Sequence, residues 1–208
     1  RNRTETSMDR PYRITAIIGT YRKDGMIDKA TREVLRAAEA RRNAKISRIY
    51  LIERKIEFCT NCRRCTQETG ENRGECIIED DMNAILDEID RSDAVILASP
   101  VNFGTVTAVM KRFVERLICH ARWPWGANAP KPRNGGKDRH VVILMSSAAP
   151  SFLTRLSGCA ARPLKDAAKL MGAGRIDMMF IGLAAGKKHP SLPERAKHKA
   201  RRIGRNLS

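Results

Sequence analysis

The sequence predicts an α/β fold, a doubly wound sheet of five parallel strands in a three-layer α/β/α arrangement. Short apolar or β-branched runs alternate along the chain with longer segments whose apolar residues recur at helical spacing. Several of these runs are apolar throughout, which is typical of parallel strands covered on both faces. Right-handed crossovers between such strands leave only a few doubly wound topologies.

Length and composition indicate one domain with a substantial hydrophobic core. The chain has 208 residues, 42% of them hydrophobic, and no apolar run approaches the roughly 20 residues that a membrane helix requires. The polar segment 1–11 lacks the apolar stretch of a secretory signal. We expect this segment to be disordered, or its first residues to precede a natural start at Met8, and we leave it out of the fold. We expect a single domain over residues 12–208, with no membrane span. We also expect it in the cytoplasm, where thiols stay reduced.

The five expected strands are short, and turn residues bound them. The first ends at Gly19, and the third, a fully apolar run, ends at Ser99 and Pro100. In chain order, the strands are residues 12–18, 46–52, 94–98, 141–145 and 176–183.

The expected helices repeat apolar residues every three or four positions. The second helix opens with Asp80 and Asp81, which suit the positive N-terminal end of a helix dipole. Two stretches are expected as loops, a cysteine-rich one at 54–79 and a Pro-, Gly- and Trp-rich one at 122–137. In chain order, the helices are 26–40, 80–89, 105–120, 153–171 and the very basic 191–207.

Three loops follow strands at the same predicted edge of the sheet. They are residues 19–27, 99–104 and 146–150. A doubly wound sheet binds its ligands beyond the carboxyl ends of the strands, where the strand order reverses. We therefore expect the functional site among these loops.

The loop after the first strand has the features of an anion site. Its backbone N–H groups and the dipole of the next helix attract negative charge. Thr20 offers a hydroxyl, and Arg22 a guanidinium fork for phosphate oxygens. The loop lacks the Gly-Lys-Ser/Thr ending of a Walker loop and the G-x-G-x-x-G of a dinucleotide site. Taken alone, it is also compatible with an ordinary turn and a solvated arginine.

The loop after the third strand could face a planar ring. Pro100 stiffens the turn and removes one N–H donor, and the amides that follow it could meet polar ring edges. The alternative is a plain strand-to-helix connection in which Phe103 belongs to the core.

Together, these segments resemble the NADPH-dependent FMN reductase group of flavodoxin-like proteins. The resemblance is strongest at GTYRK (19–23), CTNCRRC (59–65), DDM (80–82), ASPVNFG (98–104) and MKRF (110–113). It implies a flavodoxin-like fold, bound FMN and NAD(P)H as co-substrate. It implies no catalytic side chain, because flavin N5 carries the chemistry. The implied cofactor-binding residues are Thr20, Arg22, Gly25, Met26 and Ile27 for phosphate, Pro100, Val101, Asn102, Phe103 and Gly104 for the ring, and Ser147, Ala148 and Ala149 on the facing loop.

Four cysteines form a compact metal-type motif. Cys59, Cys62 and Cys65 are spaced C-x₂-C-x₂-C, and Cys76 follows after a gap of ten residues. The run resembles iron–sulfur ligation and is similar to the run in the same loop of iron–sulfur flavoproteins. Three interpretations stay open: a [4Fe–4S] cluster, a structural zinc ion, and empty thiols packed as small hydrophobes. We expect the four sulfurs to lie close together, near the flavin edge.

The remaining reactive or aromatic residues receive more modest interpretations. Cys119 and Cys159 fall on expected helices and are taken as buried, inert thiols. Trp123 and Trp125 could cover a flavin, fill a subunit interface or pack within the monomer. The histidines show no ligand spacing and are assigned no chemistry. They are His120, His140, His189 and His198.

Three functions follow, in descending order. The first is an FMN-dependent oxidoreductase that takes hydride from NAD(P)H and passes electrons to an unidentified acceptor. The second is an electron-transfer protein with a cluster on the cysteine loop. The third is a binding module for nucleic acid or an acidic partner, based on the net charge of +17 and the basic end. We rank nucleic acid lowest because the chain lacks aromatic–basic interleaving. Related flavoproteins associate, so we expect a homodimer or homotetramer.

Overall fold

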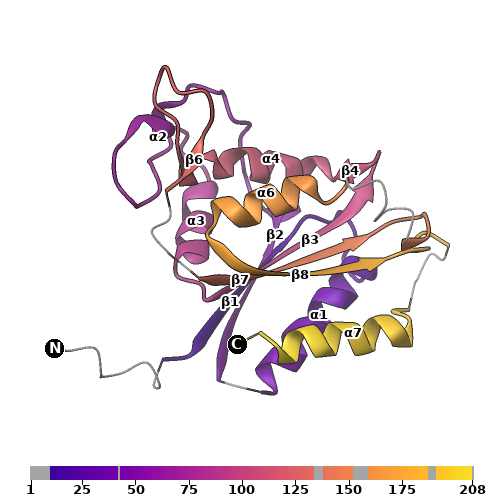
Figure 1. Cartoon of the computed structure of the whole chain (residues 1–208). Coiled ribbons are helices and arrows are strands. Elements are labelled where there is room, and N and C mark those ends of the chain that lie inside the picture. The colour runs from indigo at the N-terminus through magenta and orange to yellow at the C-terminus, as the bar shows by residue number, and fades with distance from the viewer. Residues whose placement is uncertain (1–9, 42, 134–137, 152–158, 187–190, 208) are drawn as a thin grey trace.

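Five parallel strands form the centre of the computed structural model, in the order β2-β1-β3-β7-β8 (Figure 1). Their bounds are β1 Tyr12–Ile18, β2 Ala44–Tyr50, β3 Ala94–Asn102, β7 Arg139–Ser146 and β8 Ala173–Ile181. The order reverses between β1 and β3, which is the switch point of a flavodoxin-like sheet. The structure describes residues 10–207, apart from 42, 134–137, 152–158 and 187–190. The predicted fold class is confirmed.

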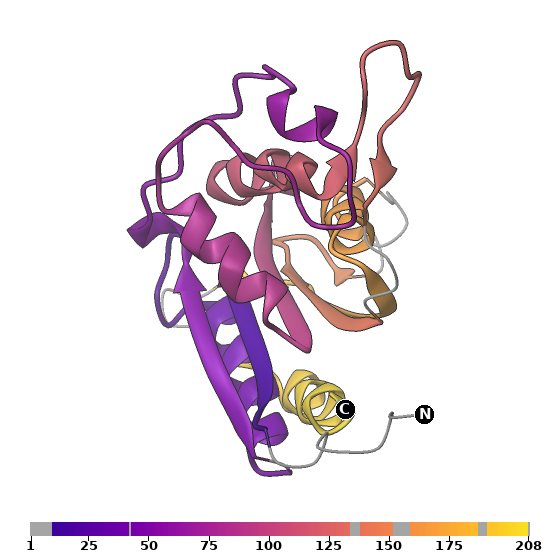
Figure 2. The same cartoon turned by 90° about the vertical axis from the view of Figure 1, so that its left-hand side faces the viewer.

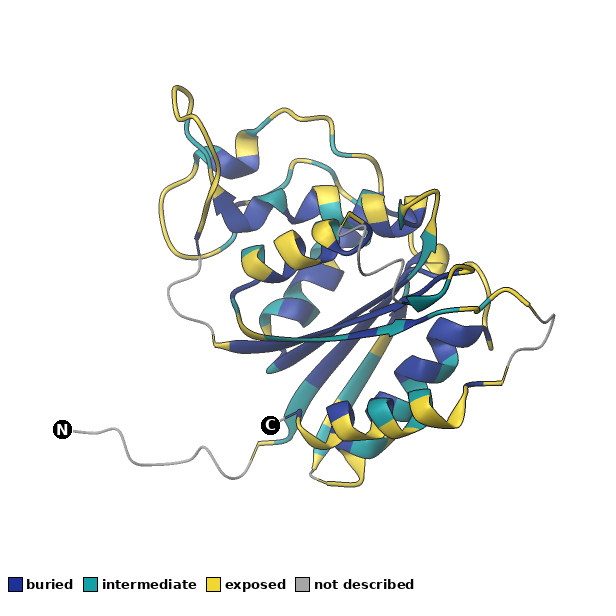
Figure 3. Cartoon of the chain, turned by 45° about the vertical axis from the view of Figure 1, so that its right-hand side comes forward, coloured by how far each residue is buried: buried dark blue, intermediate teal, exposed yellow. Residues whose placement is uncertain are grey.

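Helices cover both faces of this sheet (Figures 1 and 2). Helices α1 (Met26–Glu39) and α7 (Glu194–Arg205) pack on one face, and α3 (Met82–Asp90), α4 (Ala108–Arg116) and α6 (Arg162–Leu170) pack on the other. Figure 3 shows the central strands as mainly buried between these layers. At the crossing of α1 and α7, a Cβ on Gly204 would lie 2.2 Å from the Val34 carbonyl oxygen. Glycine at this position therefore lets the two helices approach closely.

Three helix predictions were too long. Within 105–120, Thr105–Val106 form strand β4, Thr107 caps α4, and Leu117–His120 form the 3-10 helix η2. Thr107 is extended, and its side chain accepts a bond from the Met110 N–H, so the helix begins after it. The helix expected at 153–171 is α6, which has a proline in its first turn. Residues 152–158 of that prediction lie outside the described residues. The last helix begins after Pro193 and ends at Arg205.

The two predicted loops contain short elements of their own. The cysteine-rich stretch holds helix α2 (Arg64–Gln67) and follows the 3-10 helix η1 (Leu51–Glu53). The second stretch is an antiparallel hairpin of β5 (Ala121–Arg122) and β6 (Lys131–Pro132). The Trp123 N–H donates to the Thr66 carbonyl oxygen at 2.8 Å, so the two excursions form one structured end of the molecule (Figure 2).

The N-terminal segment and the absence of a membrane span are the two remaining expectations about the chain. In the part of the chain that the structure describes, every helix is too short or too polar to cross a membrane. The segment 1–11 falls mostly outside the described residues, so its separation from the fold stays a prediction.

Candidate functional site

A cavity of about 300 Å³ opens where the three predicted loops meet. Of the thirteen residues expected to bind the cofactor, ten line it. Phe103, Gly104 and Ala149 do not line it, whereas Tyr21, Ser146, Ala184 and Ala185 do and were not predicted. The ten are Thr20, Arg22, Gly25, Met26, Ile27, Pro100, Val101, Asn102, Ser147 and Ala148.

The first loop presents the N-terminus of α1 to this cavity. Gly25 is the extended residue before the helix, and the first amides of a helix have no partner within it. Met26 and Ile27 have buried side chains, so backbone N–H groups are what they can offer to a ligand. The Thr20 hydroxyl accepts the Arg22 N–H at 3.2 Å and shapes the turn. Orphan amides at the start of a long helix fit a phosphate group.

A carboxylate in the same first turn is compensated within the protein. Asp28 is buried and accepts hydrogen bonds from the Asp24 N–H at 2.9 Å, the Arg32 guanidinium at 2.7 Å and the Tyr50 hydroxyl at 2.6 Å. Burial and the bond to Asp28 raise the pKa of Tyr50 to about 12, so the phenol stays a donor. The negative charge of Asp28 therefore need not repel an anion at the α1 N-terminus.

The second loop is a tight hairpin rather than a simple connection to α4. Val101 pairs with Val106 and Asn102 with Thr105, leaving Phe103 and Gly104 as a two-residue turn. Both turn residues have positive φ, 48° for Phe103 and 78° for Gly104, which is a left-handed conformation that phenylalanine rarely adopts. Phe103 is fully exposed, so its alternative interpretation as a core residue is wrong.

The third loop is joined to the end of β8. The Ser147 N–H donates to the Ile181 carbonyl oxygen at 2.9 Å, and the Ala184 N–H donates to the Ser147 carbonyl oxygen at 2.9 Å. These bonds bring Ala184 and Ala185 to the rim of the cavity. Ligands of a doubly wound sheet bind beyond the carboxyl ends of its strands, and this holds for the fifth strand as well. The sequence signal for Ala184 and Ala185 was therefore their position just after that strand.

The cysteine loop is folded back on itself. A Cβ on Gly74 would lie 1.8 Å from the Cys65 carbonyl oxygen, so only glycine allows the returning chain to pass there. Burial, followed by the charges of the Cys76, Cys59 and Cys62 thiols, raises the pKa of Cys65 to about 11. Each of the other three thiols is thus near enough to Cys65 to act on it electrostatically. Among the described residues, however, no three His, Cys, Asp or Glu side chains are arranged to hold a metal ion. The cluster and zinc interpretations stay predictions.

A buried ion pair holds both ends of the cysteine loop. Arg116, at the end of α4, donates to Asp80 at 2.7 Å and to the Glu57 carbonyl oxygen at 2.9 Å, and its second amino group lies 3.4 Å from the Cys76 sulfur. Its side chain and that of Asp80 are 1% and 0% exposed. Burial alone would raise the pKa of Asp80, but bonds from Arg116 and from the Glu57 and Met82 N–H groups outweigh it and lower that pKa.

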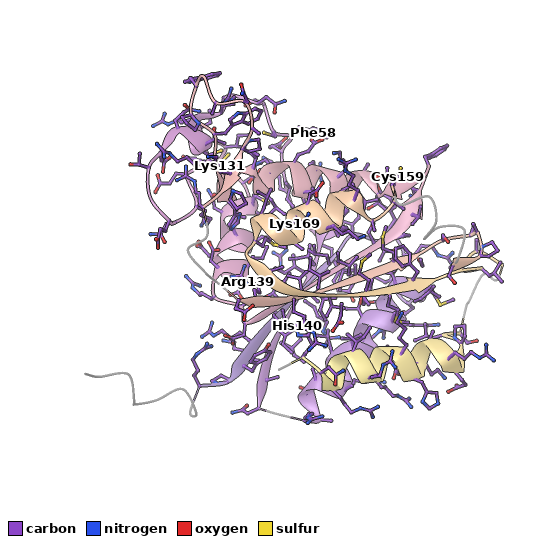
Figure 4. All side chains as sticks on the ribbon, in the orientation of Figure 1. Phe58, Lys131, Arg139, His140, Cys159 and Lys169 are labelled. Atoms are coloured by element: carbon purple, nitrogen blue, oxygen red, sulfur yellow. The ribbon has the colours of Figure 1, made fainter. Side chains whose placement is uncertain are left out.

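The tryptophan hairpin packs on the same loop. The Arg63 guanidinium lies 4.0 Å from the Trp123 ring centre and 4.2 Å from that of Trp125, and it donates to the Trp123 carbonyl oxygen at 2.7 Å. Packing within the monomer, one of the three interpretations of these tryptophans, therefore holds, although Trp125 remains largely exposed. In Figure 4, Phe58 and Lys131 mark the cysteine loop and the hairpin at this end.

The other thiols and histidines divide between buried and exposed positions. Cys119 is buried as predicted, and burial raises its pKa to about 12. Cys159 is exposed and precedes α6, so its interpretation as a buried helical thiol is wrong (Figure 4). His120 and His140 contact Asp90 and Asp177, at 3.2 and 2.9 Å.

The fold and the cavity define a class of protein. It is a doubly wound domain whose switch point carries a cavity between the loop that leads into α1, the β3–β4 hairpin and the loop after β7. The chain belongs to the NADPH-dependent FMN reductase family, whose model matches residues 12–151.

Curated relatives with sequence similarity carry the name iron–sulfur flavoprotein. One from Archaeoglobus fulgidus is 35% identical over 108 residues, which are 52% of this chain and 46% of that protein. One from Methanosarcina thermophila is 26% identical over 137 residues, 62% of this chain and 69% of that protein. The chain thus spans about half the length of the first curated relative.

Solved structures share the fold at low sequence identity. An NAD(P)H:quinone oxidoreductase from Methanothermobacter marburgensis superimposes with a TM-score of 0.66 at 20% identity, over 95% of this chain and 96% of that one. An FMN-dependent NADH-azoreductase from Bacillus anthracis, solved with FMN, gives 0.70 at 11% identity, over 94% and 99%. At these identities, the likeness supports the fold alone.

Proposed function

We propose that this protein is an FMN-dependent oxidoreductase that takes hydride from NAD(P)H and passes electrons to an acceptor. The observation that carries the proposal is the cavity at the switch point, where α1 presents its N-terminal turn and Pro100–Asn102 form another wall. Bound FMN would supply the redox chemistry through its N5 atom. Family membership and the names of the curated relatives support the same conclusion.

The protein's own residues would bind and orient the cofactor. The α1 amides, the Thr20 turn and Arg22 would hold the phosphate, and the backbone of Val101 and Asn102 would meet the ring. No side chain needs to act as an acid or a base. The acceptor is left open, and quinones and azo compounds are the first to test because the superimposed structures act on them.

The test starts from the flavin-free protein. The fluorescence of added FMN should be quenched on binding, with one FMN bound per chain. Anaerobic NADPH or NADH should then bleach the visible absorption band of the bound flavin. A protein that retains no FMN, or one that binds it without being reduced by either nucleotide, contradicts the proposal.

The second candidate is an electron-transfer protein with an iron–sulfur cluster beside the flavin. Its support is the set of four thiols on one folded loop, tied at both ends, together with the iron–sulfur flavoprotein names of the relatives. Iron and acid-labile sulfide are to be measured on anaerobically purified protein. Four of each per chain would favour this candidate, while zinc alone, or no metal, would remove it.

Self-association would complete the surroundings of the cavity. Tyr21, Phe103 and Leu183 are 49%, 107% and 70% exposed, and they lie on the loops that follow β1, β3 and β8. Large exposed apolar side chains grouped at one edge are typical of interaction sites. We therefore keep the expectation of a homodimer or homotetramer, which light scattering at micromolar concentration tests directly.

A further inference from the structure

A basic groove lies between α1 and α7, far from the cavity at the strand ends. It has a volume of about 480 Å³, and its lining residues are Glu33, Arg36, Ala37, Ala40, Arg41, Arg201 and Arg205. The α1 helix starts at the cavity and runs to the opposite edge of the sheet, so the groove near its last turn belongs to that other edge (Figure 1). The groove is therefore independent of the proposed flavin site.

The charges of this groove are not balanced within the protein. Glu33 is its one lining carboxylate, and it pairs with Arg201 at 2.9 Å. Arg36, Arg41 and Arg205 form no ion pair with any carboxylate in the described parts of the chain. By contrast, arginines elsewhere, such as Arg73 and Arg116, do pair with aspartates.

Helix dipoles offset only part of the groove's excess positive charge. The C-terminal ends of α1 and α7 each carry about half a negative charge, and cations are favourable beside them. Two such ends and Glu33 offset roughly two of the four arginine charges that line the groove. A surplus of about two positive charges thus remains in the groove, whose other lining residues are Ala37 and Ala40.

We infer that this groove binds the backbone of a single-stranded nucleic acid. Guanidinium forks match phosphate oxygens and also stack on bases, so arginines can hold a strand without aromatic residues. Single-strand sites combine a positive groove that follows the backbone with stacking surfaces. The net charge of +17 would draw such a polyanion to the protein.

This groove raises nucleic acid above the low rank assigned to it from the sequence alone. That rank depended on the absence of interleaved aromatic residues. The groove needs none, because its arginines come from the end of α1, the turn after it and α7, which are far apart in the sequence and adjacent in the fold.

The test uses a triple variant and a control with the same change of charge. R36Q/R41Q/R205Q removes the unpaired arginines of the groove. R91Q/R162Q/K165Q removes three exposed cations at the end of α3 and on α6, which cover the other face of the sheet. Fluorescence anisotropy then measures binding of labelled oligouridine and oligothymidine across a salt series, with FMN titration as a check on folding.

The groove variant should lose tenfold or more in affinity at low salt. The slope of the logarithm of its binding constant against the logarithm of the salt concentration should become shallower by about two, since each lost single-strand phosphate contact contributes roughly 0.7. The control variant should keep the slope, and both variants should bind FMN like the parent. Equal losses in the two variants, no binding by the parent, or equally tight and equally arginine-dependent binding of a duplex or of polyglutamate would overturn the inference. Normal FMN binding in these variants keeps the flavin proposal separate from this result.

Discussion

Replacing Arg116 with methionine tests whether the buried ion pair secures the cysteine loop. The guanidinium bonds the Asp80 carboxylate, the Glu57 carbonyl oxygen and the Cys76 sulfur, which stand at the two ends of the loop. Methionine keeps much of the volume and removes every one of these bonds. Asp80 would be left buried with two backbone N–H donors, those of Glu57 and Met82.

The expected loss of stability is large for one substitution. Removing one partner of a buried pair costs about 3–5 kcal/mol, because the other charge stays desolvated. The Asp80 carboxylate keeps the bonds that the Glu57 and Met82 N–H groups donate, which places the loss toward the lower end, about 3 kcal/mol in the free energy of unfolding. Lys111→Met on the same helix is the control, since its pair with Glu115 is exposed and contributes less than about 1 kcal/mol.

The pH dependence gives a second and independent signature. The folded pKa of Asp80 lies below its ordinary value, so its stabilising contribution is present above about pH 4 and is lost as the pH falls through the folded pKa. Without Arg116, burial would instead raise that pKa, and protonation would relieve the lone carboxylate. The stability gap between parent and variant should therefore narrow as the pH falls from neutral toward 4.

Urea unfolding of the flavin-free proteins at several pH values measures this gap. Reaction of the thiols with Ellman's reagent at neutral pH measures loosening of the loop, which should expose Cys65. A gap below about 1 kcal/mol, or one that stays constant with pH, would refute the assignment of Arg116 and Asp80 as a stabilising pair.

Three further substitutions give measurable outcomes. Arg22→Ala should weaken FMN binding by about 1.5–3 kcal/mol if the guanidinium bonds phosphate, and an unchanged fluorescence titration would exclude it from the site. Gly204→Ala should destabilise the fold by about 1–3 kcal/mol, because its Cβ would overlap α1. Gly186→Ala, which has open space around it, is the control and should leave stability unchanged. Equal thermal unfolding midpoints for the two variants would contradict this prediction. His140 has a lowered pKa because burial outweighs its bond to Asp177, so stability should fall as the pH drops below about 6.5, and His140→Gln should flatten that slope.

The sheet and most of the cavity could be predicted because both follow from local pattern. Each parallel strand is an apolar run, and turn residues such as Gly19 and Pro100 mark where it ends. Once the strands are placed, their carboxyl ends must share one edge. Residues Ala184 and Ala185 were missed only because the loop after the fifth strand was not considered with the other three.

Helix ends and the environment of single residues were harder to predict. Thr107 divides what reads as one helix, because its hydroxyl caps α4 and its backbone is extended. Cys159 was placed on a helix that begins later, after Ala161. Phe103 is apolar and lies next to a buried strand, but the two-residue hairpin turn directs it to solvent. At Thr107 and Phe103, one local hydrogen bond or turn overrides the apolar pattern.

The contacts of the cysteine loop could not be predicted, because they join residues distant in the sequence. Arg63 binds the Trp123 carbonyl oxygen, Arg133 donates to the Cys65 carbonyl oxygen at 3.1 Å, and Arg116 binds Asp80. Each guanidinium reaches several acceptors at once, which is what arginine's rigid fork permits and lysine's ammonium does not. The loop therefore depends on α4 and the hairpin for its shape, and hardly on its own short helix. A cluster or a zinc ion bound to these thiols would add to a frame that the arginines already hold, so loss of the metal alone should leave the sheet and the flavin cavity intact.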